Sequence, residues 1–334
     1  QIIKVAAGQT FAERIVIDES FPRGIRIVAE PGPAPVLAPP GGDPIVTVRS
    51  GSGRVEGFRL EGFRLDATGK DVAIELTDWT IGAELKGLEI TGFQKAGVHF
   101  NGAQTFQKED ERIVVTGTTF QSPVPEAVGI RISAKEHDSG YIRVNKCRFL
   151  GPLESGILVE CDMRWLEVSE SIFTSLSHGI RFAGAERGWF ELSIVFNTFY
   201  QNDRAIVFME MPATRSRGFQ FHNNLFLESR TVDMLVEKGY KAADFYLMYA
   251  TFPAGSGYNW TTRPPTTPPN PDELIAPFET TGGRRGVGDL QFLSVDPVSP
   301  DFLAPTPDAP QRQAGNLLDK KPYGTHVGAV RPKP

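Results

Sequence analysis

The sequence predicts an all-β solenoid in which each repeat of about 27 residues forms one coil of short parallel strands. Three observations predict it: a regular spacing of phenylalanines, a short alternating strand after most of them, and a turn-rich composition. The 334 residues include 34 Gly, 26 Pro and 23 Phe. Short strands exclude a helical-repeat protein, because its units need two long amphipathic helices. An all-β sandwich is the alternative, and the constant spacing favours the solenoid.

Phenylalanine marks the repeat most clearly. Successive members of the series lie 30, 27, 29, 24, 26 and 27 residues apart. The series is Phe63, Phe93, Phe120, Phe149, Phe173, Phe199 and Phe226. Two residues before most of them stands a small polar residue, such as Asn197 or Asn224. Stacked coils would repeat at roughly 4.8 Å, so both residue types are predicted to form columns.

A second predicted strand follows most of these phenylalanines and opens on a glycine or alanine. The segments read GVHF, GIRI, GILV, GIRF and AIVF. The opening residues, for example Gly156 and Gly179, are interpreted as turn residues. Side chains alternate between the two faces of a strand, so the third residue of each segment should point outward. The predicted outward column is Glu75, His99, Arg131, Leu158, Arg181 and Val207.

One domain is predicted over residues 1–334. Residues 1–57 would form the N-terminal coils and residues 58–237 the regular coils. Residues 238–334 would hold a helix or loop and an extended C-terminal segment, with a short amphipathic helix predicted within residues 237–252. Residues 259–278 are too rich in proline for the interior of a sheet and should run extended over the surface.

The generic pattern V-x-x-[NS]-x-F followed by G-I-x-[FV] resembles the right-handed parallel β-helix proteins of the pectin-lyase-like superfamily. The resemblance covers residues 45–237. It implies a single-stranded right-handed parallel β-helix, with the proline-rich C-terminal segment packing along it. It also implies that the small polar column forms a hydrogen-bonded ladder at a bend, and that polysaccharide binds along an outer face. The chain is similar, too, to β-helix domains found C-terminal to bacterial serine/threonine kinases, although it contains no kinase motif.

The superfamily's catalytic motifs are not intact in this chain. The paired aspartates and the Gly-His-Gly that accompany Arg-x-Lys in the polygalacturonase members are missing, as are the calcium region and arginine element of pectate lyases. In the stretch SHGIRF, His178 therefore resembles only a fragment of Gly-His-Gly and is interpreted as a turn residue.

The predicted outward column supplies the candidate site residues. His99 or Arg131 could act as a catalytic base, and Glu75, His99, Arg131 and Arg181 could bind substrate, with an arginine holding an acidic sugar's carboxylate. The alternative is that these are ordinary exposed charges of mixed sign. Trp79, expected in a loop after a strand, could stack on a sugar ring or cap a hydrophobic end.

Other groups give weaker chemical signals. Ca²⁺ is the one cofactor that the acids Asp66, Asp71 and Asp78 suggest, because carboxylates bind it. No EF-hand spacing accompanies them, so no metal site and no other cofactor is predicted. Cys147 and Cys161 fall at different corners of one coil and are predicted to be free, buried thiols. Asn259 begins an Asn-Trp-Thr glycosylation sequon.

Charge and composition limit the kinds of partner that this protein is expected to bind. A net charge of −5 gives no general reason to bind nucleic acid, and no apolar run is long enough for membrane insertion. The chain begins at Gln1 without a signal-like segment, so we expect a mature form or excised domain from an extracellular, cell-surface or periplasmic protein. The expected function is a non-catalytic carbohydrate-recognition or scaffold/sensor module of a larger bacterial surface protein. The alternative is a polysaccharide lyase or glycoside hydrolase acting on an acidic polysaccharide.

Overall fold

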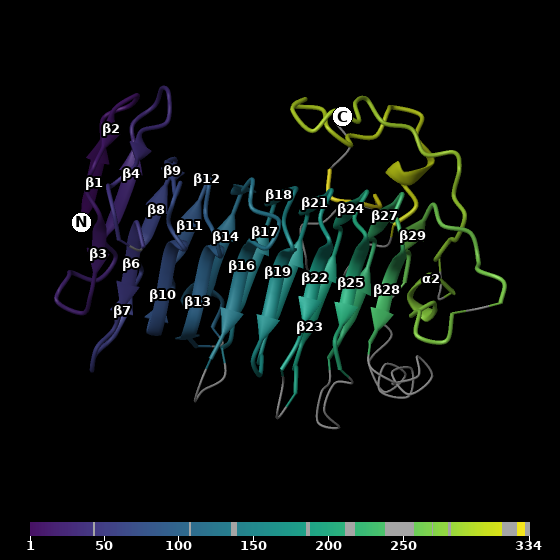
Figure 1. Cartoon of the computed structure of the whole chain (residues 1–334), viewed down its shortest axis with the longest axis horizontal. Helices are drawn as coiled ribbons and strands as arrows, with labels where there is room; N and C mark the ends of the chain where they lie inside the picture. The colour runs from purple at the N-terminus through teal and green to yellow at the C-terminus, as the bar shows by residue number, and fades with distance from the viewer. Residues whose placement is uncertain are drawn as a thin grey trace.

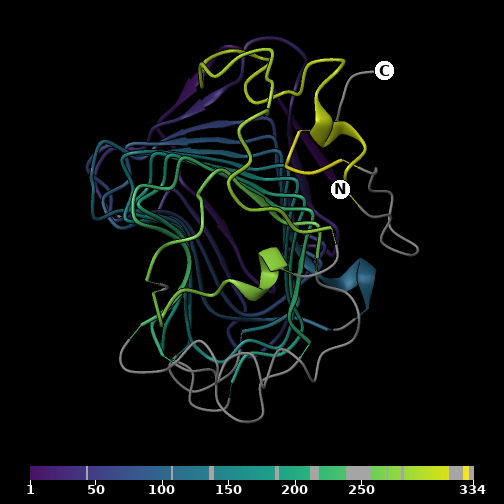
Figure 2. The same cartoon turned by 90° about the vertical axis from the view of Figure 1, so that its right-hand side faces the viewer.

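Three parallel sheets run the length of the molecule, and the chain visits each sheet in turn as it coils from the N-terminal to the C-terminal end (Figures 1 and 2). This confirms the predicted parallel β-helix and rules out the sandwich. The computed structural model describes residues 1–42, 44–106, 108–134, 139–184, 188–210, 218–237, 257–268, 270–279, 282–315 and 326–330.

We number the sheets in the order in which the chain first enters them. Sheet 1 contains β1 (Ile2–Val5), β4 (Arg26–Ala29), β8 (Arg59–Glu61), β11 (Glu84–Lys86), β14 (Ile113–Thr116), β17 (Ile142–Asn145), β20 (Leu166–Ser169), β23 (Leu192–Val195) and β26 (Gln220–His222). Sheet 2 contains β2 (Thr10–Phe11), β5 (Val36–Leu37), β9 (Arg64–Asp66), β12 (Glu89–Thr91), β15 (Thr119–Gln121), β18 (Arg148–Leu150), β21 (Ile172–Thr174), β24 (Thr198–Tyr200), β27 (Leu225–Leu227) and β29 (Trp260–Thr261).

Sheet 3 has the longest strands. It contains β3 (Ile15–Ile17), β6 (Val46–Arg49), β10 (Val72–Ile81), β13 (Ala96–Gln104), β16 (Val128–Ser133), β19 (Ser155–Glu160), β22 (His178–Phe182), β25 (Arg204–Phe208) and β28 (Val232–Val236), with β7 (Val55–Glu56) pairing to β10. The described helices are short: α2 (Ala276–Glu279) and the 3₁₀ helices η1 (Glu109–Glu111) and η2 (Pro310–Arg312). No helix in this described part of the chain is long and apolar enough to cross a membrane.

A two-residue bend joins sheet 1 to sheet 2 in most coils. Its first residue adopts a left-handed backbone, as at Lys146 with φ 54°. Its second residue is buried and forms the predicted ladder. The backbone N–H of Asn197 donates to Asn224 Oδ1 at 3.0 Å, and Asn197 Nδ2 donates to the carbonyl of Val168 at 2.9 Å. These bonds satisfy backbone groups that the turn would otherwise leave buried and unpaired.

The ladder continues to Asn259, the residue of the glycosylation sequon. Its side chain is fully buried, and its Nδ2 donates to the carbonyl of Phe221 at 2.8 Å. The folded chain therefore presents no glycan acceptor at this position.

The phenylalanine column is real but shorter than the spacing predicted. Five rings stack face to face with centroids 4.7 to 4.9 Å apart. They are Phe120, Phe149, Phe173, Phe199 and Phe226. Phe63 and Phe93 were wrongly included, because the register continues the column from Phe120 through Ile90 to Leu65. Both are buried elsewhere in the core, since any large apolar side chain can fill a layer of the column.

The glycines that open the sheet 3 segments are strand residues, contrary to the turn prediction. Gly156 lies in β19 and Gly179 in β22, and neither has a left-handed φ. A Cβ added to Gly156 would lie 2.5 Å from a ring carbon of Phe173 and 2.8 Å from the carbonyl oxygen of Gly179. Glycine is needed here because the phenylalanine column passes against the strand.

The proline-rich segment enters the fold at its two ends, so the prediction that residues 259–278 run over the surface holds only for the middle of the segment, where Pro264, Pro265 and Pro271 are exposed. Trp260 and Thr261 form β29 at the end of sheet 2. Phe278 then packs edge-on against Phe226, 5.0 Å between centroids, and covers the end of the phenylalanine column. The described prolines of this segment do not prevent this, because all of them follow the strand.

The last described residues return along the coils, as predicted for the C-terminal segment. The backbone N–H of Ala329 donates to Thr198 Oγ1 at 2.8 Å, and that of Gly328 donates to the carbonyl of Asn223 at 2.8 Å. The helix predicted within residues 237–252 lies, apart from residue 237, outside the described residues. Cys147 and Cys161 are both buried and form no disulfide, as predicted, and burial raises the pKa of the Cys147 thiol to about 12.

Replacing Gly156 by alanine should destabilise the fold. The added Cβ would press on Phe173 and on the backbone of the next coil, an overpacking that costs about 1–3 kcal/mol. Urea unfolding followed by circular dichroism should show a lower midpoint for Gly156→Ala. The control is Gly288→Ala, where the added Cβ meets no atom within 4 Å and the midpoint should be unchanged or slightly higher. Equal midpoints for the two variants would contradict the packing role of Gly156.

Candidate functional site

The outer face of sheet 3 carries the predicted column of candidate residues. The observed register pairs each residue with the next one along the solenoid: Glu75, His99, Arg131, Leu158, Arg181 and Val207. The register follows from the alternation within each strand, since the inward partners of His99, Val98 and Phe100, are fully buried. The structure thus brings together residues from consecutive coils that are 23 to 32 positions apart in sequence.

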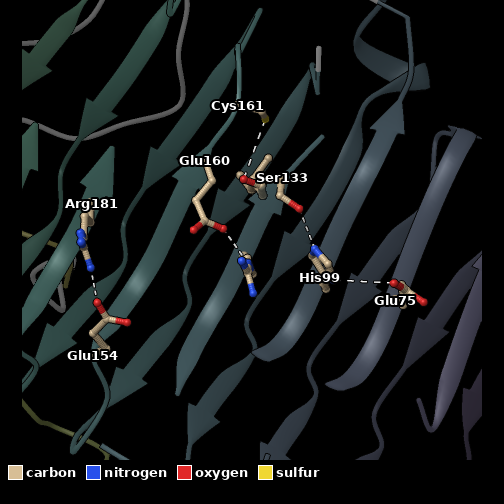
Figure 3. Close-up of polar contacts among 9 residues, drawn as sticks. Glu75, His99, Ser133, Glu154, Glu160, Cys161 and Arg181 are labelled. Atoms are coloured by element: carbon tan, nitrogen blue, oxygen red, sulfur yellow. Dashed lines mark hydrogen bonds and ion pairs between the residues drawn. The ribbon is translucent and has the colours of Figure 1, made fainter. Parts of the chain in front are cut away.

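His99 sits at the centre of a polar cluster built from three coils (Figure 3). Its Nε2 lies 2.8 Å from Ser133 Oγ, and its Nδ1 lies 3.6 Å from Glu75 Oε1. Asn101 Nδ2 donates to the same oxygen of Glu75 at 3.3 Å. Ser133 is in register with Asn101, one coil away, so its hydroxyl reaches His99 diagonally across the sheet. Sequence reasoning named Glu75 and His99 but missed Ser133 and Asn101, two positions further along their strands.

Burial keeps His99 neutral near neutral pH. Its side chain is 16% exposed, and this desolvation lowers the pKa of the imidazole. The charge of Arg131 lowers the pKa further, while Glu75 and Glu160 act in the opposite direction without reversing the shift. A neutral imidazole has one N–H donor and one acceptor nitrogen. The tautomer with the proton on Nδ1, facing Glu75, leaves Nε2 to accept a hydrogen bond from Ser133.

The two arginines of the column are already paired with glutamates. Arg131 Nε donates to Glu160 Oε2 at 2.6 Å, and Arg181 forms an ion pair with Glu154 (Figure 3). The buried side chain of Leu158 separates the two pairs. An incoming carboxylate would have to displace these glutamates, which weakens the predicted role of the arginines in holding an acidic sugar. The two glutamates, Glu154 and Glu160, lie on either side of Leu158 in sequence. Their proximity to the two arginines could therefore have been inferred from the register.

Trp79 lies in strand β10 rather than in the predicted loop. A register shift between Thr77 and Trp79 ends the regular pairing of β10 with β13. The Trp79 side chain stays 38% exposed, with its ring 5.3 Å from that of Phe106. The guanidinium carbon of Arg54 lies 5.7 Å from the Trp79 centroid and 5.1 Å from the Phe106 centroid. We call Trp79, Phe106 and Arg54 the aromatic cluster.

His178 and the aspartates Asp66, Asp71 and Asp78 do not belong to the polar cluster around His99. His178 begins strand β22 instead of forming a turn, and its Nδ1 lies 3.2 Å from the carbonyl oxygen of Glu154. Asp66 bonds Thr68, Asp71 pairs with Lys95, and Asp78 is exposed. Among the residues that the structure describes, no three His, Cys, Asp or Glu side chains are grouped to hold a metal ion.

The fold has a known counterpart among solved structures. The crystal structure of the pectate lyase Pel9A superposes with a TM-score of 0.55 at 12% sequence identity, over 100% of this chain and 86% of that one. At this identity the likeness shows the shared fold alone. No protein-family model and no curated protein sequence matches the chain.

We expect the pKa of His99 to respond in opposite directions to its two charged neighbours. Glu75→Gln removes a charge that raises the pKa and should lower it further, whereas Arg131→Gln should raise it. Titration of ¹⁵N-labelled histidines by NMR measures both shifts. His178, whose charged neighbours are other residues, serves as the internal control and should not move. Shifts of the same sign in both variants would contradict the geometry of the cluster.

Proposed function

We propose that the outer face of sheet 3 binds a polysaccharide. The observation that carries the proposal is the combination of a row of hydrogen-bonding groups on this face with an exposed aromatic cluster further along strand β10. Glu75 and Trp79 belong to the same strand, four residues apart. A sugar offers hydroxyl groups at its edge and an apolar ring face, which match the Glu75–Asn101–Ser133 groups and the indole of Trp79 respectively.

The length of the solenoid supports an extended ligand. Adjacent coils repeat at about 4.8 Å, so a chain of sugars lying across the strands would meet equivalent positions coil after coil. A solved structure with this fold is that of a pectate lyase, and that activity makes a polysaccharide ligand the natural first choice. We place the protein outside the cell or in the periplasm, as a recognition, scaffold or sensor module of a larger bacterial surface protein.

A lyase acting on an acidic polysaccharide is the less favoured candidate. Such a reaction needs a base that removes a carbon-bound proton and a cation that binds the uronate. The two arginines of the column, Arg131 and Arg181, are engaged by glutamates and are therefore not available to bind a uronate carboxylate. The face fits a neutral or ester-bearing polysaccharide better than a polyanion.

Trp79→Ala should weaken binding to the best ligand on a glycan array about fivefold, because losing one stacking contact costs about 1 kcal/mol. Phe21→Ala is the matched control, since Phe21 is similarly exposed, at 41%, but lies near the N-terminal end of the solenoid. Equal affinities for the wild type and Trp79→Ala would show that the aromatic cluster is not part of the binding face. An unsaturated, ultraviolet-absorbing product from an acidic polysaccharide would instead support the lyase.

A further inference from the structure

We propose that Glu75, His99 and Ser133 form a carboxylate–imidazole–hydroxyl triad that hydrolyses an ester carried by the bound polysaccharide. Ser133 Oγ is the nucleophile, His99 is the general base and acid, and Glu75 orients and stabilises the imidazole. The choice of a polysaccharide ester rests on the proposed function, whereas the triad itself rests on the geometry of three side chains.

The distances match the roles of the three groups. The 2.8 Å separation of Ser133 Oγ and His99 Nε2 is within the range expected for a nucleophile and its base. Glu75 approaches the other ring nitrogen at 3.6 Å, longer than a hydrogen bond, and such contacts commonly tighten when substrate excludes water. The three residues come from β10, β13 and β16, so rigid neighbouring strands hold each of them.

The charge state of the cluster suits acyl transfer. A neutral His99 can accept the Ser133 proton, and Glu75 and Glu160 can stabilise the imidazolium that results. His178 offers a contrast on the same sheet. It is also half-buried with a lowered pKa, but its Nδ1 lies against the backbone carbonyl of Glu154 rather than against a hydroxyl.

The reaction balances with water as the only co-reactant. Ser133 Oγ attacks the ester carbonyl as its proton passes to His99 Nε2, and the tetrahedral intermediate collapses when the alcohol oxygen leaves with that proton. Water then attacks the acyl-serine, again giving its proton to His99, and the carboxylic acid departs as Ser133 regains its hydrogen. We assign the stabilisation of the negatively charged oxygen to the second N–H of the Asn101 amide, whose first N–H donates to Glu75 and which is in register with Ser133.

A fluorophosphonate probe tests the triad on the full chain without any sugar. The probe reacts with activated serines, and mass spectrometry of the digested protein identifies the modified residue. We expect the wild type to be labelled at Ser133, with labelling lost in Ser133→Ala and reduced at least tenfold in His99→Gln. Ser52→Ala, which removes an exposed serine elsewhere, should label as the wild type does.

The pH dependence separates a triad from a merely reactive serine. The labelling rate should rise as His99 loses its proton, and Glu75→Gln should move that rise to lower pH while slowing the plateau rate. A wild type that stays unlabelled, or labelling that persists in Ser133→Ala, would overturn the triad. Far-ultraviolet circular dichroism and thermal midpoints establish that each variant is folded.

The experiments distinguish a failure of the triad proposal from a failure of the proposed polysaccharide binding. Labelling at Ser133 without binding to any glycan on the array would support the triad and contradict the proposed polysaccharide ligand. Hydrolysis of p-nitrophenyl acetate, abolished by Ser133→Ala, would then define the activity. Glycan binding without labelling would retain the recognition surface and remove the triad.

Discussion

The parallel, in-register pairing of one coil with the next is the constraint on which the rest of the structure depends. Each strand must match its neighbour residue for residue, because a shift by one position would turn its outward side chains into the core. The core enforces the match: five phenylalanine rings stack at 4.7 to 4.9 Å, and the Asn197–Asn224–Asn259 ladder bonds one bend to the next. Packing inside the solenoid therefore determines which side chains meet outside it.

The candidate site is a consequence of that register. Glu75, His99 and Ser133 are far apart in sequence, and none lies in a recognisable motif, yet stacking places them side by side on sheet 3. The same register sets Glu160 beside Ser133, where it forms a diagonal ion pair with Arg131 and neutralises the positive charge that the sequence alone suggested was free to bind an acidic ligand. The resulting face is polar, with little free charge, next to an exposed aromatic cluster.

Period and alternation were enough to predict the solenoid and the outward column from sequence, because these features repeat from coil to coil, whereas the bend ladder was implied by the family resemblance. Predictions failed where a residue type had more than one physical role. Phe63 was assigned to the ring column although Leu65 fills that layer, and Gly156 was taken for a turn residue although it makes room for Phe173. Ser133 was missed because diagonal contacts between coils depend on side-chain reach, which spacing does not encode.

Spin-label distances along sheet 1 test the in-register stacking most directly. The buried native thiols should remain unlabelled, so nitroxides can be attached to the pairs Arg26→Cys/Gln220→Cys and Glu84→Cys/Gln220→Cys. Gln220 is seven strands from Arg26 and five from Glu84, which at about 4.8 Å per strand predicts separations of roughly 34 and 24 Å. Pulsed electron paramagnetic resonance should find a difference of about 10 Å, two coil repeats. Separations that do not scale with the number of intervening strands would contradict the stacking, and with it the assembly of Glu75, His99 and Ser133 into one site.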